Sequence, residues 1–198
     1  MANGTAQLQI VADRAVLPLG RRVPRGRLRW YLVACPEGRE AATCERVRQI
    51  LPKEVLENAF VPRKENTFKR HGEWKIEVID FFRGYFIAVT GDAPALSRAL
   101  SRLSFPARMV GAVGRGWQPV SEDAQRLLEQ TMDEGHVVRL SWGEIVSDEL
   151  RVDRGPLVGK EGRVSTFNRR RSWAYVRVGE RDGGTATLSM PLAIVARR

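Results

Sequence analysis

Three consecutive arginines between two aromatic residues are the part of this sequence with the clearest chemistry. The stretch FNRRRSW runs from residue 167 to residue 173. Adjacent guanidinium groups repel one another unless an anion neutralises them. Guanidinium groups pair with phosphates or base edges, and aromatic rings stack on unpaired bases. The pattern therefore predicts an RNA-binding site, with these residues as its candidates: Arg163, Asn168, Arg169, Arg170, Arg171 and Trp173. The alternative is a solvated hairpin tip whose aromatics, Phe167 and Trp173, face a core, as alternate strand residues do.

A second basic stretch lies in the first half of the chain. The polar run NTFKRHGEW (residues 66–74) is flanked by apolar residues and contains a glycine, which is a hairpin signal. Its cations are Lys64, Lys69, Arg70, His71 and Lys75, and three glutamates among them dilute the charge. The stretch predicts either a weak backbone contact with nucleic acid or a solvated hairpin without a partner.

The charge of the whole chain agrees with an anionic partner. The 198 residues carry 33 Lys and Arg against 23 Asp and Glu, a formal net charge of +10. The last 61 residues hold 12 basic and seven acidic side chains, so much of the excess is placed there. With 43% hydrophobic residues the chain can bury a core, and the composition is not that of a disordered protein.

The sequence offers no recognisable catalytic or metal-binding motif. It has no Ser/His/Asp order and no phosphate-cradling glycine loop, so we expect no enzyme. Cys35 and Cys44 are nine residues apart and the histidines are His71 and His136, which is not a metal-ligand spacing, so neither a metal nor a cofactor is expected. We expect both cysteines to be free, with small and partly buried side chains; a disulfide between them is the alternative.

No apolar run approaches the roughly 20 residues that cross a bilayer, and the start of the chain lacks the apolar stretch of a signal peptide. A cytoplasmic protein without a membrane partner is the expectation.

The elements that must position these residues divide into two groups. Residues 30–34 (WYLVA) and 81–90 (FFRGYFIAVT) are typical strands, and residues 55–61 suggest another. Apolar residues at three- and four-residue steps predict helices over 37–51, 94–103 and 122–132, the last capped by Ser121. This order predicts an α+β amino-terminal domain, an antiparallel sheet flanked by helices.

After residue 135 the segments become short and β-rich. Turns bearing Gly155-Pro156, Gly162 and Gly183-Gly184 separate them, which predicts a small all-β barrel. The expected organisation is a mobile basic leader (1–26), the α+β domain (27–132), a linker (133–138) and the barrel (139–198).

The chain resembles the NusG family of transcription elongation factors over roughly residues 30–195. WYLVA followed by RGYFIAV some 50 residues later resembles that family's amino-terminal domain, and RVDRGPLVGKEGRV (residues 151–164) resembles its KOW motif, which lies on an SH3-like barrel. Arg83 stands where the family usually has proline, and Gly183-Gly184 where it usually has Gly-Arg. With the arginine triplet, these departures resemble specialised paralogues of the LoaP antiterminator type more than the general factor.

The resemblance implies a monomer with two partners. Ala34, Phe82, Tyr85 and Ile87 would dock on the clamp helices of bacterial RNA polymerase and suppress pausing and termination, while the KOW domain binds a nascent RNA hairpin. The basic hairpin would lie toward non-template DNA or a polymerase loop.

The residues themselves add that strand 81–90 has more aromatics than alternation can bury. A bulge or twist near Gly84 and an exposed apolar patch are therefore expected, with burial under the helices as the alternative.

Two other functions remain open from the sequence. Arg83-Gly84-Tyr85 also resembles the start of the aromatic strand motif of an RRM, so the chain could be a stand-alone RNA-binding module that uses Tyr85. It could also be a general elongation factor that needs no RNA signal.

Overall fold

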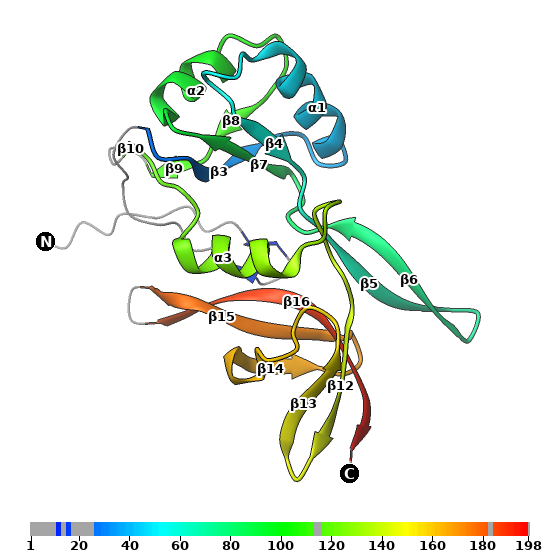
Figure 1. The fold of residues 1–198 in the computed structure, drawn as a ribbon. Helices are drawn as coiled ribbons and strands as arrows, with labels where there is room; N and C mark the ends of the chain where they lie inside the picture. The colour runs from blue at the N-terminus through cyan, green and yellow to red at the C-terminus, as the bar shows by residue number, and fades with distance from the viewer. Residues whose placement is uncertain (1–10, 13–14, 17–25, 113–115, 182–183, 198) are drawn as a thin grey trace, which may run out of the picture.

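The computed structural model describes residues 11–12, 15–16, 26–112, 116–181 and 184–197. Most of the predicted leader therefore lies outside the described residues. Figure 1 shows one sheet with two of the helices, α1 and α2, above it, a second sheet below, and a hairpin projecting to one side. None of the helices in the described ranges is long and apolar enough to span a membrane.

The upper sheet is antiparallel, with strand order β4-β7-β3-β8. The two central strands are the ones predicted most clearly, and they pair from Arg29 opposite Thr90 to Ala34 opposite Tyr85. The bounds of the four strands are β3 (Arg29–Ala34), β4 (Asn58–Phe60), β7 (Tyr85–Thr90) and β8 (Arg108–Met109). Two-residue strands form two further pairs: β1 (Val11–Ala12) with β2 (Ala15–Val16), and β9 (Gly111–Ala112) with β10 (Gly116–Trp117).

Two helices cover one face of this sheet, α1 (Glu40–Ile50) and α2 (Ala93–Leu100). Val47 and Leu96 from these helices share a buried cluster with Val33 and Phe86 from the strands. Asp92 caps α2 by accepting a hydrogen bond from the Ala95 N–H at 3.0 Å. Both helices were predicted from their periodicity.

Helix α3 (Glu122–Thr131) covers the opposite face. Its cap is Ser121, as predicted, whose Oγ accepts from the Ala124 N–H at 3.3 Å. The apolar side of α3, with Leu127 and Leu128 fully buried, shares one cluster with Ile87 of the upper sheet and Val176 of the lower one. The helix thus lies between two sheets and contributes to both.

A three-stranded sheet with order β11-β5-β6 joins the upper and lower parts. Strands β5 (Arg63–Arg70) and β6 (Glu73–Asp80) form the predicted hairpin, which projects from the body (Figure 1). Strand β11 (Val137–Val138) comes from the predicted linker and pairs in parallel with Arg63 and Lys64 alone.

The lower sheet has the order β13-β12-β16-β15-β14, in which β12 and β16 are parallel. One of its turns depends on a glycine of the KOW-like stretch. Gly155 has φ +99°, and a Cβ added there would lie 2.6 Å from Ser141 Cα, so only glycine fits without a shift. The bounds are β12 (Ser141–Val146), β13 (Glu149–Arg154), a 3₁₀ turn η1 (Glu161–Arg163), β14 (Val164–Asn168), β15 (Trp173–Arg181) and β16 (Gly184–Arg197).

The predicted fold class, an α+β amino-terminal domain followed by a small SH3-like KOW barrel, is wrong for this structure. The described residues are mostly β, with three α-helices and three larger sheets of three, four and five strands. A single buried cluster runs from the upper sheet through α3 into the lower sheet. The prediction failed because an amphipathic helix pattern shows that a face is buried, and does not show how many sheets that face covers.

Candidate nucleic-acid interface

The arginine triplet lies in the turn between β14 and β15, at the surface. Arg169, Arg170 and Arg171 are all exposed, and no carboxylate of the described residues forms an ion pair with them. Asn168 Oδ1 accepts a hydrogen bond from the Arg171 N–H at 3.1 Å, and Ser172 has φ +52°. Asn168 was predicted to bind RNA; in the structure its side chain shapes the turn, and the three guanidinium groups lie in solvent.

Trp173 lies behind the triplet and is only 8% exposed. The guanidinium carbon of Arg171 lies 6.0 Å from the centre of its ring, and Lys64 Nζ lies 4.7 Å from that centre. Phe167 is partly buried and packs against the buried cluster that holds Ala174 and Val176, of which Trp173 is not a member. The alternative interpretation, with both aromatics in the core, therefore holds only in part: Phe167 packs against the core, whereas Trp173 is buried beside Lys64 and Arg171 and is too enclosed to stack on a base.

Lys64 is buried, which the sequence did not predict. It is 1% exposed, and its Nζ lies 4.8 Å from the centre of the Phe81 ring as well as beside Trp173. The same nitrogen donates a long hydrogen bond to Ser189 O at 3.5 Å. As a surface contact for DNA, Lys64 was wrongly predicted: it links the projecting hairpin to the lower sheet.

A second link between hairpin and lower sheet lies beside it. Glu65 accepts from the Leu140 N–H at 2.7 Å and from Arg139 Nη1 at 3.1 Å. Arg139 Nε donates in turn to Asp133 at 2.6 Å. Backbone hydrogen bonds, that from the Val137 N–H above all, hold the pKa of Asp133 below its usual range.

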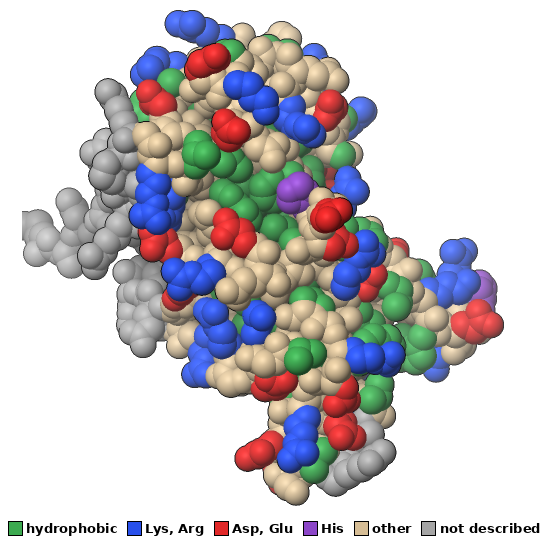
Figure 2. Space-filling view, viewed as in Figure 1, with side chains coloured by type: hydrophobic (Ala, Val, Ile, Leu, Met, Phe, Trp, Pro, Cys, Tyr) green, Lys and Arg blue, Asp and Glu red, His purple; other side chains and the backbone are tan. Residues whose placement is uncertain are grey.

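The other predicted cations of the hairpin are exposed near its tip. Lys69, Arg70, His71 and Lys75 all lie at the surface, and Figure 2 shows basic side chains gathered at the end of the projection beside an acidic one. The turn itself is tight, because His71 and Gly72 have φ +51° and +86°. Glu73 stands opposite Arg70 across the strands and dilutes the charge there.

The structure brings part of the hairpin and part of the triplet together. A groove of about 330 Å³ lies between β5 and the turn before β15. It is distinct from a groove of about 430 Å³ beside His136. We name the former the hairpin–turn groove. Its lining residues are Asn66, Thr67, Phe68, Lys69, Trp74, Arg170, Arg171 and Trp173. Two basic sets that the sequence treated as separate sites therefore share one surface.

Trp74 is the residue of this groove that sequence reasoning missed. It is 61% exposed, and Ile76 and Val78 on the same face of β6 are 52% and 46% exposed. Their spacing of two residues was visible in the sequence and showed that they share one face of a strand. The spacing did not show that none of the described residues packs over this face.

Arg163 does not belong to this surface. It precedes β14 whereas the triplet follows it, and its Nε donates to Arg177 O at 3.1 Å. The structure therefore places Arg163 at the far end of the strand from the other candidates.

The predicted polymerase-binding patch is largely buried. Phe82 and Ile87 are fully buried, and Tyr85 and Ala34 are half-buried as cross-strand neighbours. The expectation of an exposed apolar patch is wrong for this arrangement, since Ile87 shares its buried cluster with α3 and the lower sheet. The predicted irregularity lies before the strand, where Gly84 has φ +76°.

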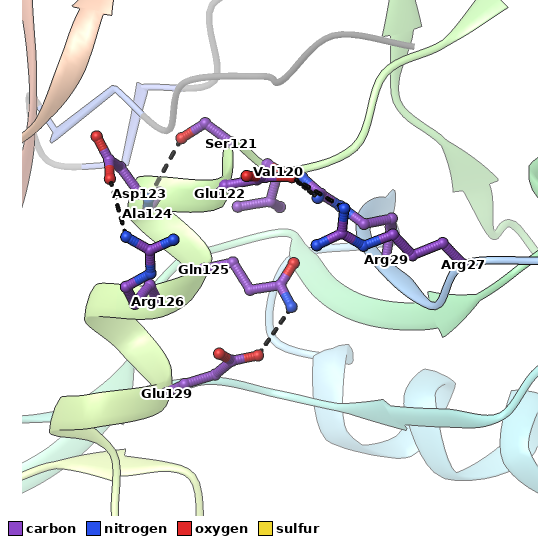
Figure 3. A network of polar contacts seen from close by, with 10 residues as sticks. All are labelled: Arg27, Arg29, Val120, Ser121, Glu122, Asp123, Ala124, Gln125, Arg126 and Glu129. Atoms are coloured by element: carbon purple, nitrogen blue, oxygen red, sulfur yellow. Dashed lines mark hydrogen bonds and ion pairs between the residues drawn. The ribbon is translucent and has the colours of Figure 1, made fainter. Parts of the chain in front are cut away.

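Ionic contacts join the start of α3 to Arg29 and Arg27, as Figure 3 shows. The buried guanidinium of Arg29 on β3 donates to Glu122 Oε1 at 2.5 Å and to Val120 O at 3.2 Å. The hydrogen bond from Arg29 is the main cause that lowers the pKa of Glu122. Arg27 approaches the same carboxylate at 3.6 Å. These contacts anchor the first turn of α3 to the upper sheet.

Neither cysteine is in a disulfide, and burial raises the pKa of Cys35 to about 12 and that of Cys44 to about 11. Such thiols are poor nucleophiles and poor metal ligands near neutral pH. Within the described ranges, no group of three or more His, Cys, Asp or Glu side chains could hold a metal ion.

The comparisons with protein families and with curated proteins found no match for the chain.

Proposed function

We propose that this chain is a transcription elongation and antitermination factor that acts in the cytoplasm. It binds nascent RNA through the arginine turn and bacterial RNA polymerase through its amino-terminal part, and it suppresses pausing and termination. The observation that carries the proposal is the exposed triplet at residues 169–171, which has no ion-pair partner among the described residues. Three unneutralised guanidinium groups on one turn favour an anion with closely spaced charges, such as an RNA backbone.

The polymerase contact comes from the resemblance to NusG and needs a change of arrangement. Phe82 and Ile87 are fully buried, and Ile87 shares its cluster with Leu127 of α3. Docking through these two side chains therefore requires α3 and the lower sheet to move off the upper sheet. Polymerase would supply the free energy for this separation by covering the same apolar surface. Its binding would select the state in which α3 and the lower sheet have moved off the upper sheet.

A second candidate function is an RNA-binding module that has no polymerase partner. The burial of Phe82 and Ile87 favours it, because neither side chain is then exposed on the upper sheet for a partner to cover. Association with polymerase separates the two functions.

The RNA half of the proposal is tested with a labelled stem-loop RNA whose loop is randomised. The variant R169A/R170A/R171A is compared with R39A/R98A/R102A, which removes three exposed arginines from the upper part of the molecule. Each lost phosphate contact lowers the slope of log K against log salt by about 0.7, so the triplet variant should lose roughly two units of slope. Equal slopes for the triplet variant and the wild type would contradict the assignment.

The polymerase half is tested by co-sedimentation of the purified chain with bacterial core polymerase and by single-round transcription through a terminator. We expect association and increased read-through, and the triplet variant should keep the association. RNA binding without any association with polymerase would refute the elongation-factor proposal and support the second candidate.

A further inference from the structure

The hairpin–turn groove is lined by β5, by Trp74 of β6 and by the turn before β15, and β5 is paired along only part of one edge in the described part of the chain. Strand β11 pairs with β5 at Arg63 and Lys64 alone, whereas β6 pairs along the whole length of β5 on the other side. Beyond Lys64, the edge of β5 that faces away from β6 therefore has no strand partner among the described residues. A free strand edge presents main-chain donors and acceptors.

The lining of the groove is basic and aromatic. Lys69, Arg170 and Arg171 contribute three cations, and none of the eight lining residues is acidic. The glutamates that dilute the charge elsewhere on the hairpin, Glu73 and Glu77, are not among them. The groove therefore has a uniform positive sign, which fits an anionic occupant.

An aromatic platform stands at the hairpin side of the groove. Trp74 is the most exposed tryptophan side chain of the described residues at 61%, and its cross-strand partner is Lys69. An exposed indole beside a cation suits a base that stacks while its phosphate pairs with the cation. The wall also holds two polar atoms without a hydrogen-bond partner in the structure, Trp173 Nε1 and Thr67 Oγ1.

We propose that the hairpin–turn groove binds an unpaired nucleic-acid strand. A base stacks on Trp74, and the phosphates on either side of it pair with Lys69 on the hairpin and with Arg170 and Arg171 on the turn. A volume of about 330 Å³ has room for single bases, and stacking on Trp74 needs a base whose face is free, as it is in an unpaired strand. The proposal rests on the RNA binding proposed above and deepens it, because it names unpaired nucleotides as the ligand and makes the hairpin half of the site.

The geometry has a consequence for the two basic sets. Lys64 and Glu65 tie the hairpin to the lower sheet through Ser189 and Leu140, so the two walls of the groove are held in one arrangement. Because both walls contact the same strand of nucleic acid, changes on either wall weaken the same complex, and neither wall alone should retain the full affinity.

The test measures fluorescence anisotropy of the full-length chain with four labelled 12-nucleotide probes: a single-stranded RNA of mixed A and U, the same sequence as DNA, and the duplex of each. We expect both unpaired probes, or the RNA alone, to bind at least ten-fold more tightly than either duplex. Trp74→Ala should lower the affinity for the unpaired probe about ten-fold, since a base stacked on an aromatic ring contributes about that much.

Matched variants make the result specific. Trp74→Phe keeps a stacking ring and should retain most of the affinity. Ile50→Ala removes another exposed apolar side chain, on α1 and remote from the groove, and should leave the affinity unchanged. Lys69→Ala and R170A/R171A should each weaken the complex. Because Trp74 is exposed, its variants should keep the wild-type melting temperature.

Three results would overturn the inference. The first is equal affinity for unpaired and duplex probes. The second is a loss of affinity in R170A/R171A without any loss in Trp74→Ala; this result would leave the proposed RNA function intact. Unchanged RNA affinity of Trp74→Ala together with loss of polymerase association would make this face a protein contact. If the wild type binds no RNA in any form, the proposed function itself fails.

Discussion

Replacing Gly155 by alanine tests the structural reason for the glycines of the KOW-like stretch. Gly155 has φ +99°, and an added Cβ would lie 2.6 Å from Ser141 Cα, 2.7 Å from Ser141 Oγ and 2.9 Å from Leu140 O. Gly159 has φ +72° with nothing within 4 Å of its added Cβ, and Gly162 has neither a positive φ nor a near neighbour. The three positions therefore separate backbone strain from steric overlap within one short stretch.

The magnitudes follow from these differences. At Gly155 the strained φ costs about 1 to 3 kcal/mol, and the overlap with main-chain atoms adds about 1 to 3 kcal/mol, so we expect a loss of about 4 kcal/mol in the free energy of unfolding. At Gly159 the strain alone costs about 1 to 2 kcal/mol, partly offset by about 0.4 to 1 kcal/mol from the stiffer unfolded chain. At Gly162 the change should lie within about 0.5 kcal/mol of zero.

Urea unfolding of the three variants, followed by far-ultraviolet circular dichroism, measures these free energies. The expected order of destabilisation is Gly155→Ala, then Gly159→Ala, then Gly162→Ala. Equal losses at Gly155 and Gly162 would refute the reasoning, because the lower sheet would then not depend on the close approach of Gly155 to Ser141.

Three further predictions concern titration and reactivity. Burial lowers the pKa of His136 from its usual value. As the pH falls, the unfolded chain therefore takes up a proton at His136 before the folded chain does, and stability should decrease below about pH 6.5. The urea midpoint of His136→Asn should not show this decrease. Arg29 lowers the pKa of Glu122. The stability that the Glu122 carboxylate contributes is therefore present above about pH 4.3 and is lost as the pH falls through the pKa of Glu122 in the folded chain. Glu122→Gln should melt at a lower temperature than the wild type at pH 7, and the difference should vanish at acid pH. Since burial raises the pKa of Cys35 to about 12 and of Cys44 to about 11, a thiol reagent at pH 8 should label them slowly in the folded chain and rapidly in urea; fast labelling of the folded chain would contradict their burial.

Local elements were predictable because their causes are local. The strand at Arg29–Ala34 follows from a short run of strand-forming residues, and the cap of α3 from a serine hydroxyl that reaches the N–H three residues later. The hairpin tip at His71 and Gly72 was predicted for the same reason, since a turn is set by the residues within it.

The partner of each apolar face was not predictable. Ile87 presents the same sequence pattern whether another protein or its own chain covers it, and the structure shows α3 as the cover. Lys64 is a comparable case: a lysine is rarely buried, and its burial depends on Phe81 and Trp173 reaching the same place from distant parts of the chain. The groove escaped prediction because its two walls are about 100 residues apart in the sequence.

The two proposals constrain each other through the same arrangement. The groove needs the hairpin held against the lower sheet by Lys64 and Glu65, whereas polymerase docking through Ile87 needs α3 and the lower sheet moved away from the upper sheet. If the hairpin stays with the lower sheet when α3 leaves, both ligands can be bound at once. If it stays with the upper sheet, each ligand must weaken the other by the same factor, because coupling between two binding sites is reciprocal. The affinity for an unpaired RNA with and without saturating polymerase therefore shows whether the hairpin stays with the lower sheet or with the upper one.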